Sequence, residues 1–269
     1  MERPDPHSVL EVLQTLLGPN GCPWDREQTP ESLCDYLIEE VFELIEAVRT
    51  GHEQQVRDEL GDAFFLLFFL ALLLARRYGF SLNEVWQHSA AKMISRHPHV
   101  FGEASFSNRD ELLQSWEAVK RKERQGPDGQ GKGPDPMASI PASLPPLLRA
   151  YRIHSKAAKL GFSWSCDADQ DRALKAEWRE WEEAKAAGEF LDKEEELGDL
   201  LFSLVEQGRR QGVKANAALH VANRKFLSRF QGMLELAREK GLDWEALDSA
   251  AKNELWEEIK RSGASRPDS

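Results

Sequence analysis

The sequence has few cysteines and no long apolar run, and both shortages narrow the class of protein. Its 269 residues include 3 cysteines without C-x-x-C spacing, which excludes a disulfide framework and indicates reduced thiols, not a zinc site. The longest apolar run, Ala63 to Ala75, has 13 residues, whereas a helix that spans a bilayer needs about 20. No signal peptide is expected, because the opening MERPDPHSVLEVL carries acids and prolines and no apolar h-region. A cytoplasmic protein without a membrane segment is therefore predicted.

Basic residues are also fewer than acidic ones. Lys and Arg number 35 against 46 Asp and Glu, which gives a formal net charge of −11. General nucleic-acid binding requires a basic face, so this class of function is excluded. An acidic protein can still bind a polyanion when metal ions reverse the local sign of the charge. The length allows one large or two modest domains, each with its own core.

Alternating strand patterns with hairpin turns are absent, and apolar residues recur at helical spacing. Thr29 as N-cap and Pro30 at the first helical position predict a helix that ends near residue 49. A second helix is predicted from 53 to 78, ending at Gly79, and Ser81 opens a third with a capping box. The remaining predicted helices cover about 108–124, 144–160, 168–187, 193–211, 214–239 and 248–261. The expected fold class is all-α, built from helical bundles.

A stretch rich in glycine and proline separates two groups of helices. We expect an N-terminal helical domain at 1–124, a linker at 125–143, a C-terminal helical domain at 144–262 and a disordered tail at 263–269. Within the linker, Gly126, Gly131 and Lys132 match the start of a phosphate-binding loop. Gly133 follows where such a loop requires Ser or Thr, and prolines flank the segment, so the linker interpretation is preferred.

The two halves repeat a pattern of acids at one fixed offset. E-x-x-E precedes E-x-x-D in each half, and ELGD occurs in both. Corresponding acids are each 137 positions apart, as in 177 − 40 and 199 − 62. Such agreement across two helices and the turn between them indicates a tandem duplication. The acids are Glu40, Glu43, Glu59 and Asp62 in the first half, and Glu177, Glu180, Glu196 and Asp199 in the second.

These carboxylates form a candidate metal site in each half. Residues three apart share one helix face, and an antiparallel hairpin would bring both acidic pairs together across a groove. Four converging carboxylates repel one another unless a hard divalent cation lies between them, and oxygen ligands favour Mg²⁺, with Mn²⁺ as a substitute. The alternative is solvated surface charge, which is the interpretation given to Glu39, Glu46, Glu53 and Glu194.

Basic and aromatic residues recur in both halves as well. Lys92 and Arg96 lie one helical turn apart, and so do Lys225 and Arg229, which makes each pair a candidate phosphate clamp. A tryptophan precedes a lysine by one turn in two places, where the ring could stack on a base and the lysine could meet phosphate. These pairs are Trp116 with Lys120 and Trp256 with Lys260. The alternative is that both tryptophans belong to core edges and both lysines are solvated.

Several segments together resemble the MazG family of nucleoside triphosphate pyrophosphohydrolases. They are GCPWDREQT, EEVFE, ELGD, RHPHVFG, WEAVKRKE, GFSW, EEELGDLLF and NRKFLSRF, and the resemblance covers about 8–260. It implies tandem all-α bundles in an intertwined homodimer, with Mg²⁺-dependent hydrolysis of ribo- and deoxyribonucleoside triphosphates to monophosphate and pyrophosphate. The activity that the resemblance implies for the chain is housecleaning of the nucleotide pool.

The resemblance also implies site residues. The metal motif of the family matches Glu39 together with the four acids of the first half, and it matches the four acids of the second half. Ala176 stands where the second motif would begin with Glu. The nucleotide-contacting positions of the family match Lys225, Arg229, Trp256 and Lys260, and the C-terminal half is expected to be the principal site.

The chemistry expected of such a site needs no protein nucleophile. No Ser–His–Asp or Cys–His arrangement is found, so water activated by bound metal would attack phosphorus in line. His97 and His99 flank Pro98 and are interpreted as part of a structural turn. Two alternatives stay open. One is a related all-α phosphohydrolase that acts on dUTP or an alarmone, and the other is a nucleotide-binding regulatory module with one inactive half.

Overall fold

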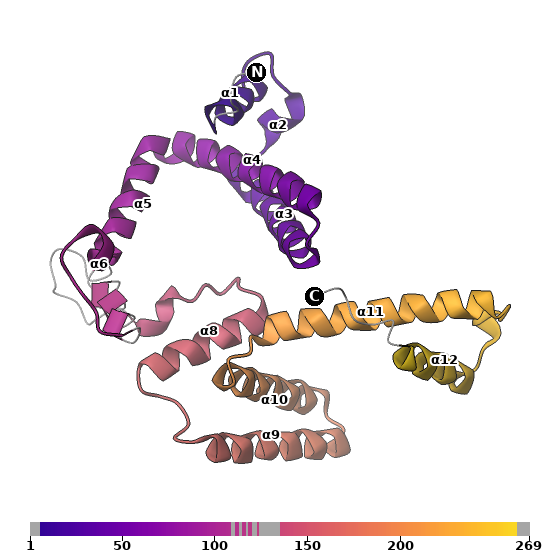
Figure 1. Cartoon of the computed structure of the whole chain (residues 1–269). Helices are drawn as coiled ribbons and strands as arrows, with labels where there is room; N and C mark the ends of the chain where they lie inside the picture. The colour runs from indigo at the N-terminus through magenta and orange to yellow at the C-terminus, as the bar shows by residue number, and fades with distance from the viewer. Residues whose placement is uncertain are drawn as a thin grey trace. The chain divides into compact units, whose positions relative to one another are not determined.

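The computed structural model describes residues 6–108, 111–112, 115–116, 118–119, 123 and 135–262. Every regular element in these ranges is a helix, which confirms the all-α prediction (Figure 1). None of the described helices combines the length and the apolar character needed to cross a membrane. The chain divides into two compact units, Met1–Asp128 and Gly129–Ser269.

The first unit is organised around a long antiparallel helix pair. Its described helices are α1 (Pro6–Leu16), α2 (Pro23–Glu27), α3 (Pro30–Thr50), α4 (Glu53–Tyr78), α5 (Leu82–Arg96) and α6 (Pro98–Phe101). The pair α3–α4 makes the main contact of the unit, and α1 packs on α4. Leu13, Leu33 and Phe69, from α1, α3 and α4, form its buried apolar cluster. The first two helices had not been predicted from the sequence.

Local sequence signals fix where the central helices begin. The Thr29 hydroxyl accepts a hydrogen bond from the Ser32 amide, and the Ser32 hydroxyl accepts one from the Thr29 amide, which completes a capping box at α3. Ser81 and Glu84 form the same arrangement at α5. Both predicted N-caps are therefore confirmed.

The second unit packs a helix pair against two further helices. Its elements are η1 (Pro136–Ser139), α8 (Pro146–Lys159), α9 (Asp167–Ala187), α10 (Phe190–Arg210), α11 (Ala215–Glu239), η2 (Trp244–Ala246) and α12 (Ser249–Arg261). The α10 helix packs on α9 and α8, and α12 packs on α11. Part of the predicted linker belongs to this unit, because η1 packs on α8 and the Lys156 ammonium donates a hydrogen bond to the Ser139 hydroxyl.

The central helix pairs of the two units correspond except at the end of the second helix, which is shorter in the second unit. Adding 137 to the bounds of α3 gives the bounds of α9, and adding 137 to the first residue of α4 gives the first residue of α10. The turns correspond as well, because Gly51 has φ 76° and Gly188 has φ 94°. This left-handed backbone conformation favours glycine and ends α3 and α9 at equivalent points. The first helix, the turn and the start of the second helix thus share the offset of the acids.

Three predicted segments lie wholly or largely outside the described residues. They are the fourth helix near 108–124, the first part of the linker and the tail at 263–269.

Candidate active site

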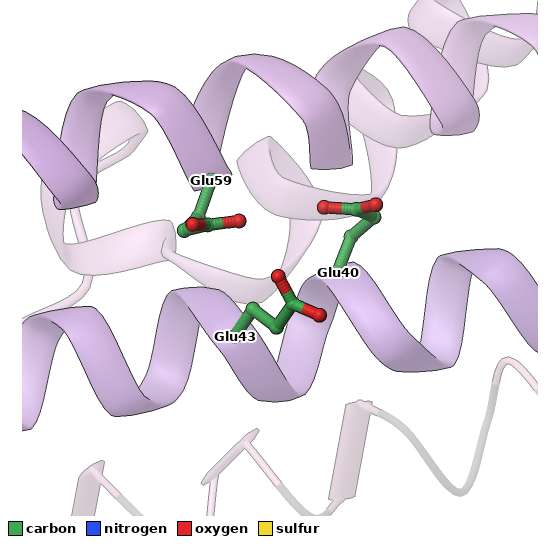
Figure 2. A group of neighbouring side chains, drawn as sticks. All are labelled: Glu40, Glu43 and Glu59. Carbon is green, nitrogen blue, oxygen red and sulfur yellow. The ribbon is translucent and has the colours of Figure 1, made fainter.

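The α3–α4 hairpin brings carboxylates from both of its helices together. Glu40 and Glu43 project from α3 and Glu59 projects from α4, and Figure 2 shows their carboxylates turned toward one another between the helices. One oxygen from each residue can be chosen so that all three lie within 4.8 Å of one another. Two ligands on opposite sides of a Mg²⁺ ion would be about 4 Å apart, so this spacing is close to what one cation requires.

The α9–α10 hairpin gathers a second trio from the repeated positions. Glu177 projects from α9, and Glu196 and Asp199 project from α10, with one oxygen from each within 4.8 Å of the others. Two of the three positions correspond to Glu40 and Glu59 of the first trio. The third differs, because the first hairpin uses its second α3 acid whereas the second hairpin uses its second α10 acid.

The remaining predicted acids lie beside these trios. Asp62 is close enough to Glu40 to raise the pKa of that carboxyl, and Glu180 acts in the same way on Glu177 and Glu196. The family motif also matched Glu39, which is exposed on α3 and outside the trio. Each hairpin therefore places all four predicted acids in one neighbourhood, with three at metal-binding spacing.

Two carboxylates of each trio are held where ionisation is electrostatically unfavourable. Burial is the largest influence raising the pKa of Glu40 and Glu59 in the first trio, followed by repulsion from neighbouring acids. The same two causes, in the same order, raise the pKa of Glu177 and Glu196 in the second. A cation between the carboxylates would relieve both penalties, since it replaces repulsion by attraction.

One oxygen in the second trio also lacks a hydrogen-bond partner. Oε2 of Glu196 is buried, and no described residue donates a hydrogen bond to it. A buried unpaired carboxylate oxygen is costly unless a ligand satisfies it. The donor set consists of oxygens alone, which is the chemistry that Mg²⁺ and Mn²⁺ prefer. The residues therefore fit a hard divalent cation.

One member of the predicted clamp of the second unit, Arg229, lies against an aromatic ring. The guanidinium carbon of Arg229 on α11 lies 5.6 Å from the ring centre of Trp256 on α12, which is cation–π distance. Phe226, one turn before Arg229, packs on the same ring with centroids 5.3 Å apart. Lys225 is exposed, and the Lys260 ammonium pairs with Glu257 at 2.8 Å. Within the described chain, no hydrogen bond or ion pair joins Lys225 or Arg229 to the acids of α9 and α10.

The predicted clamp of the first unit contains an acid that sequence reasoning did not assign to the site. Lys92 and Arg96 line a cavity of about 670 Å³ beside α5, together with His88 and Glu123. Arg96 donates hydrogen bonds from Nε to both carboxylate oxygens of Glu123, at 3.1 and 3.2 Å. The spacing of Glu123, seven residues after Trp116, places both on one helix face and could have suggested this role.

The other predicted residues of the first unit are Trp116, His97 and Lys120. The Trp116 ring packs edge-on against His97, with centroids 5.3 Å apart. Nδ1 of His97 lies 2.6 Å from the Met93 carbonyl oxygen, so this histidine has a structural environment at the junction of α5 and α6. Lys120 lies outside the described residues.

Comparison of the sequence with known proteins points to one family of nucleotide pyrophosphohydrolases. The profile of the MazG nucleotide pyrophosphohydrolase domain matches residues 28–101, which include α3 and α4. The nucleoside triphosphate pyrophosphohydrolase of Escherichia coli K12 is 35% identical over 256 residues, covering 94% of this chain and 96% of the relative. The nucleoside triphosphate pyrophosphohydrolase/pyrophosphatase MazG of Thermotoga maritima is 37% identical over 252 residues, covering 94% of each chain.

Proposed function

This chain belongs to the MazG family of nucleoside triphosphate pyrophosphohydrolases, and we propose that it hydrolyses nucleoside triphosphates to nucleoside monophosphates and pyrophosphate. The observation that carries the proposal is the convergence of three carboxylates between the two helices of each central hairpin. The near full-length similarity to enzymes of that name supports the same reaction.

A bound divalent cation is part of the proposed function. In the second unit Glu177, Glu196 and Asp199 would hold it, and in the first unit Glu40, Glu43 and Glu59 would do so. Mg²⁺ is the proposed ion, and when bound it would neutralise the triphosphate and activate water for attack on phosphorus. The fit of the carboxylates to a hard cation supports this choice, and the unpaired Oε2 of Glu196 supports the second site in particular.

The cluster on α11 and α12 is the proposed nucleotide-binding element. Arg229 offers a guanidinium to phosphate oxygens, and the ring of Trp256 offers a stacking surface to a base. Because Arg229 already contacts that ring, phosphate binding and base stacking would be adjacent on the protein. Lys225, exposed one turn earlier on α11, adds a second positive charge. This cluster supports the second unit as the principal site.

A homodimer is the proposed assembly, and a tandem duplication is the proposed origin of the chain. Large apolar side chains are exposed on both units, among them Phe162 at 83%, Phe190 at 74% and Leu191 at 75%. Surface of this kind marks an association face in proteins that stay in solution. The equal offset of helix bounds, turns and acids in the two hairpins supports the duplication.

The proposal is tested by product analysis on a panel of ribo- and deoxyribonucleoside triphosphates with Mg²⁺. We expect equimolar monophosphate and pyrophosphate. Release of orthophosphate, or turnover of dUTP or an alarmone alone, would instead indicate a different phosphohydrolase. Nucleotide binding without turnover would indicate a regulatory module, which Ala176 keeps open for the second unit. Comparing Glu40→Gln/Glu59→Gln with Glu177→Gln/Glu196→Gln assigns the activity to one unit, because these variants remove corresponding carboxylates.

A further inference from the structure

The phosphate clamp of the first unit is already occupied by a carboxylate of the same chain. Besides the two bonds from Nε, Nη2 of Arg96 donates to Oε2 of Glu123 at 2.5 Å. The pair is partly exposed, with side-chain exposed fractions of 17% for Arg96 and 28% for Glu123. A guanidinium binds a carboxylate through the same fork of N–H groups that it uses for a phosphate. Glu123 therefore occupies Nε and Nη2 of Arg96, one of the two-donor edges with which the guanidinium could bind a substrate phosphate.

The pair lies in an open pocket whose other described lining residues are basic or small. His88, Lys92 and Arg96 follow one another at intervals of one helical turn along α5, so they line one side of the cavity of about 670 Å³. Glu123 is the one acid among its described lining residues. Its pKa is held below the usual range by the hydrogen bond from Arg96, and the charge of Lys92 acts in the same direction. The carboxylate is therefore ionised at neutral pH and competes as a full negative charge.

No such competitor is found among the described residues of the second unit, 135–262. Its tryptophan on α12 is Trp256, and the residue seven positions further is Gly263, which has no side chain to offer. Arg229 faces the ring of Trp256, and it forms no ion pair within the part of the chain that the structure describes. The Nε atom of Arg229 is buried without a hydrogen-bond partner there. Among the described residues no carboxylate therefore pairs with Arg229, whereas Nε and Nη2 of Arg96 are both bonded to Glu123.

We propose that Glu123 is a built-in competitor for phosphate at Arg96, which lowers the affinity of the first unit for triphosphates relative to the second. This inference rests on the proposed function, since it assumes that both clamps meet the triphosphate. A substrate phosphate can engage Arg96 only after Glu123 has been displaced, whereas Arg229 requires no displacement. The same acid would select for highly charged ligands, because a weakly charged ligand gains less from Arg96 than Glu123 does.

The test measures binding of inorganic tripolyphosphate by calorimetry, with Mg²⁺, in the full chain. Glu196→Gln, Asp199→Asn and Arg229→Ala are included throughout to disable the second site. In this background, adding Glu123→Gln should raise the affinity about twofold to fivefold, as expected for loss of a partly exposed ion pair. Arg96→Ala should remove the gain. Glu103→Gln, which removes an equal charge from an exposed position without a described partner, should leave the affinity unchanged.

Three outcomes would overturn the proposal. They are an affinity that Glu123→Gln leaves equal or lowers, a gain that persists with Arg96→Ala, and no binding before or after the substitution. If Glu123→Gln fails to fold, Glu123→Asp serves instead, because the shorter side chain withdraws the carboxylate from Arg96 and should also raise affinity. Binding of tripolyphosphate requires no hydrolysis. Failure of this inference is therefore distinct from failure of the proposed function, which is measured as pyrophosphate release by the unaltered chain.

Discussion

Nδ1 of His154 lies 3.5 Å from Oε2 of Glu206, so that a buried acid–base pair joins α8 to α10 in the second unit. Glu206 also accepts hydrogen bonds from Arg209, at 2.7 Å from Nε and 2.9 Å from Nη2. Nε2 of His154 lies 3.1 Å from the Phe202 carbonyl oxygen. The exposed fraction of Glu206 is 3%, which makes this polar cluster part of the interior.

The equivalent positions of the first unit are apolar. Subtracting 137 from Glu206 gives Phe69, and subtracting 137 from Gln170, which is also buried, gives Leu33. The amide of Gln170 donates to the Ser203 carbonyl at 3.3 Å. The two hairpins thus share their backbone course and their acids but differ in how their interiors are held together. The first unit relies on apolar contact, and the second adds buried polar bonds.

Acid should destabilise the second unit through this cluster. Burial lowers the pKa of His154 below its ordinary value of 6.5, so the stability given by the neutral ring is present above that pH and is lost as pH falls. Burial alone would raise the pKa of Glu206, but Arg209 outweighs it, so that carboxylate also loses its contribution at low pH. The melting temperature should therefore fall as the pH is lowered from 7. His154→Leu should reduce this fall in the upper part of the pH range. His52→Gln, a substitution at an exposed position, should leave it unchanged.

Glu206→Gln should destabilise the protein by about 2–3 kcal/mol, because it leaves Arg209 in the interior without its charged partner. Urea unfolding measures the change. Glu183→Gln, at an exposed position of α9, serves as the control and should stay within about 0.5 kcal/mol of the unaltered chain. Equal effects of the two substitutions would show that the buried pair contributes nothing specific.

Removing a carboxylate of the second trio should abolish turnover there without harming the fold. Glu196→Ala or Asp199→Ala deletes one ligand, so the cation would be held weakly, while like-charge repulsion between the remaining acids decreases. The melting temperature without metal should stay equal or rise, and its increase on adding Mg²⁺ should disappear. Glu194→Ala, an exposed acid on the same helix, should retain both activity and the metal effect. Full turnover by the Glu196→Ala/Asp199→Ala double variant would move the activity to the first unit.

Arg229 and Trp256 should affect different aspects of substrate recognition. Arg229→Ala should lower kcat/KM by the same factor for all nucleotides, because every substrate carries the triphosphate. The loss corresponds to roughly 1.5–3 kcal/mol of transition-state binding. Trp256→Ala should cost about 1–3 kcal/mol and change the ranking of purines against pyrimidines, because stacking strength varies with ring size. The contact between the two side chains predicts that their effects are not additive. An unchanged ranking would make Trp256 a packing residue.

The exposed apolar side chains should be covered in solution by a second copy of the chain. Light scattering at micromolar concentration should give about twice the monomer mass of 30.6 kDa. Phe190→Ser/Leu191→Ser, at the start of α10, should shift the equilibrium toward monomer if this end of the hairpin belongs to the interface. A monodisperse monomer in the unaltered protein would contradict the prediction.

The sequence by itself determined the central helices and the equal spacing of their acids in the two halves. The caps at Thr29 and Ser81 are local hydrogen bonds between residues three apart, so they could be predicted without knowledge of the fold. The all-helical class followed from spacing in the same way. Helix α1 was missed although Val9, Leu13 and Leu16 recur at helical spacing, whereas α2, with five residues, is too short to show a helical period. Grouping of the acids could be predicted too, since a hairpin of known period leaves few ways to orient residues three apart.

Only the tertiary structure decided which side chains actually meet. Glu40 was one acid among several on α3, and its place in the trio, like the exclusion of Glu39, depends on how α3 and α4 rotate against each other. The contact of Arg96 with Glu123 joins residues 27 positions apart, and the contact of His154 with Glu206 joins residues 52 positions apart. Helical periodicity orients a residue on its own helix but carries no information about the neighbouring helix. That neighbour is set by packing of the whole unit, which brings these charges into contact.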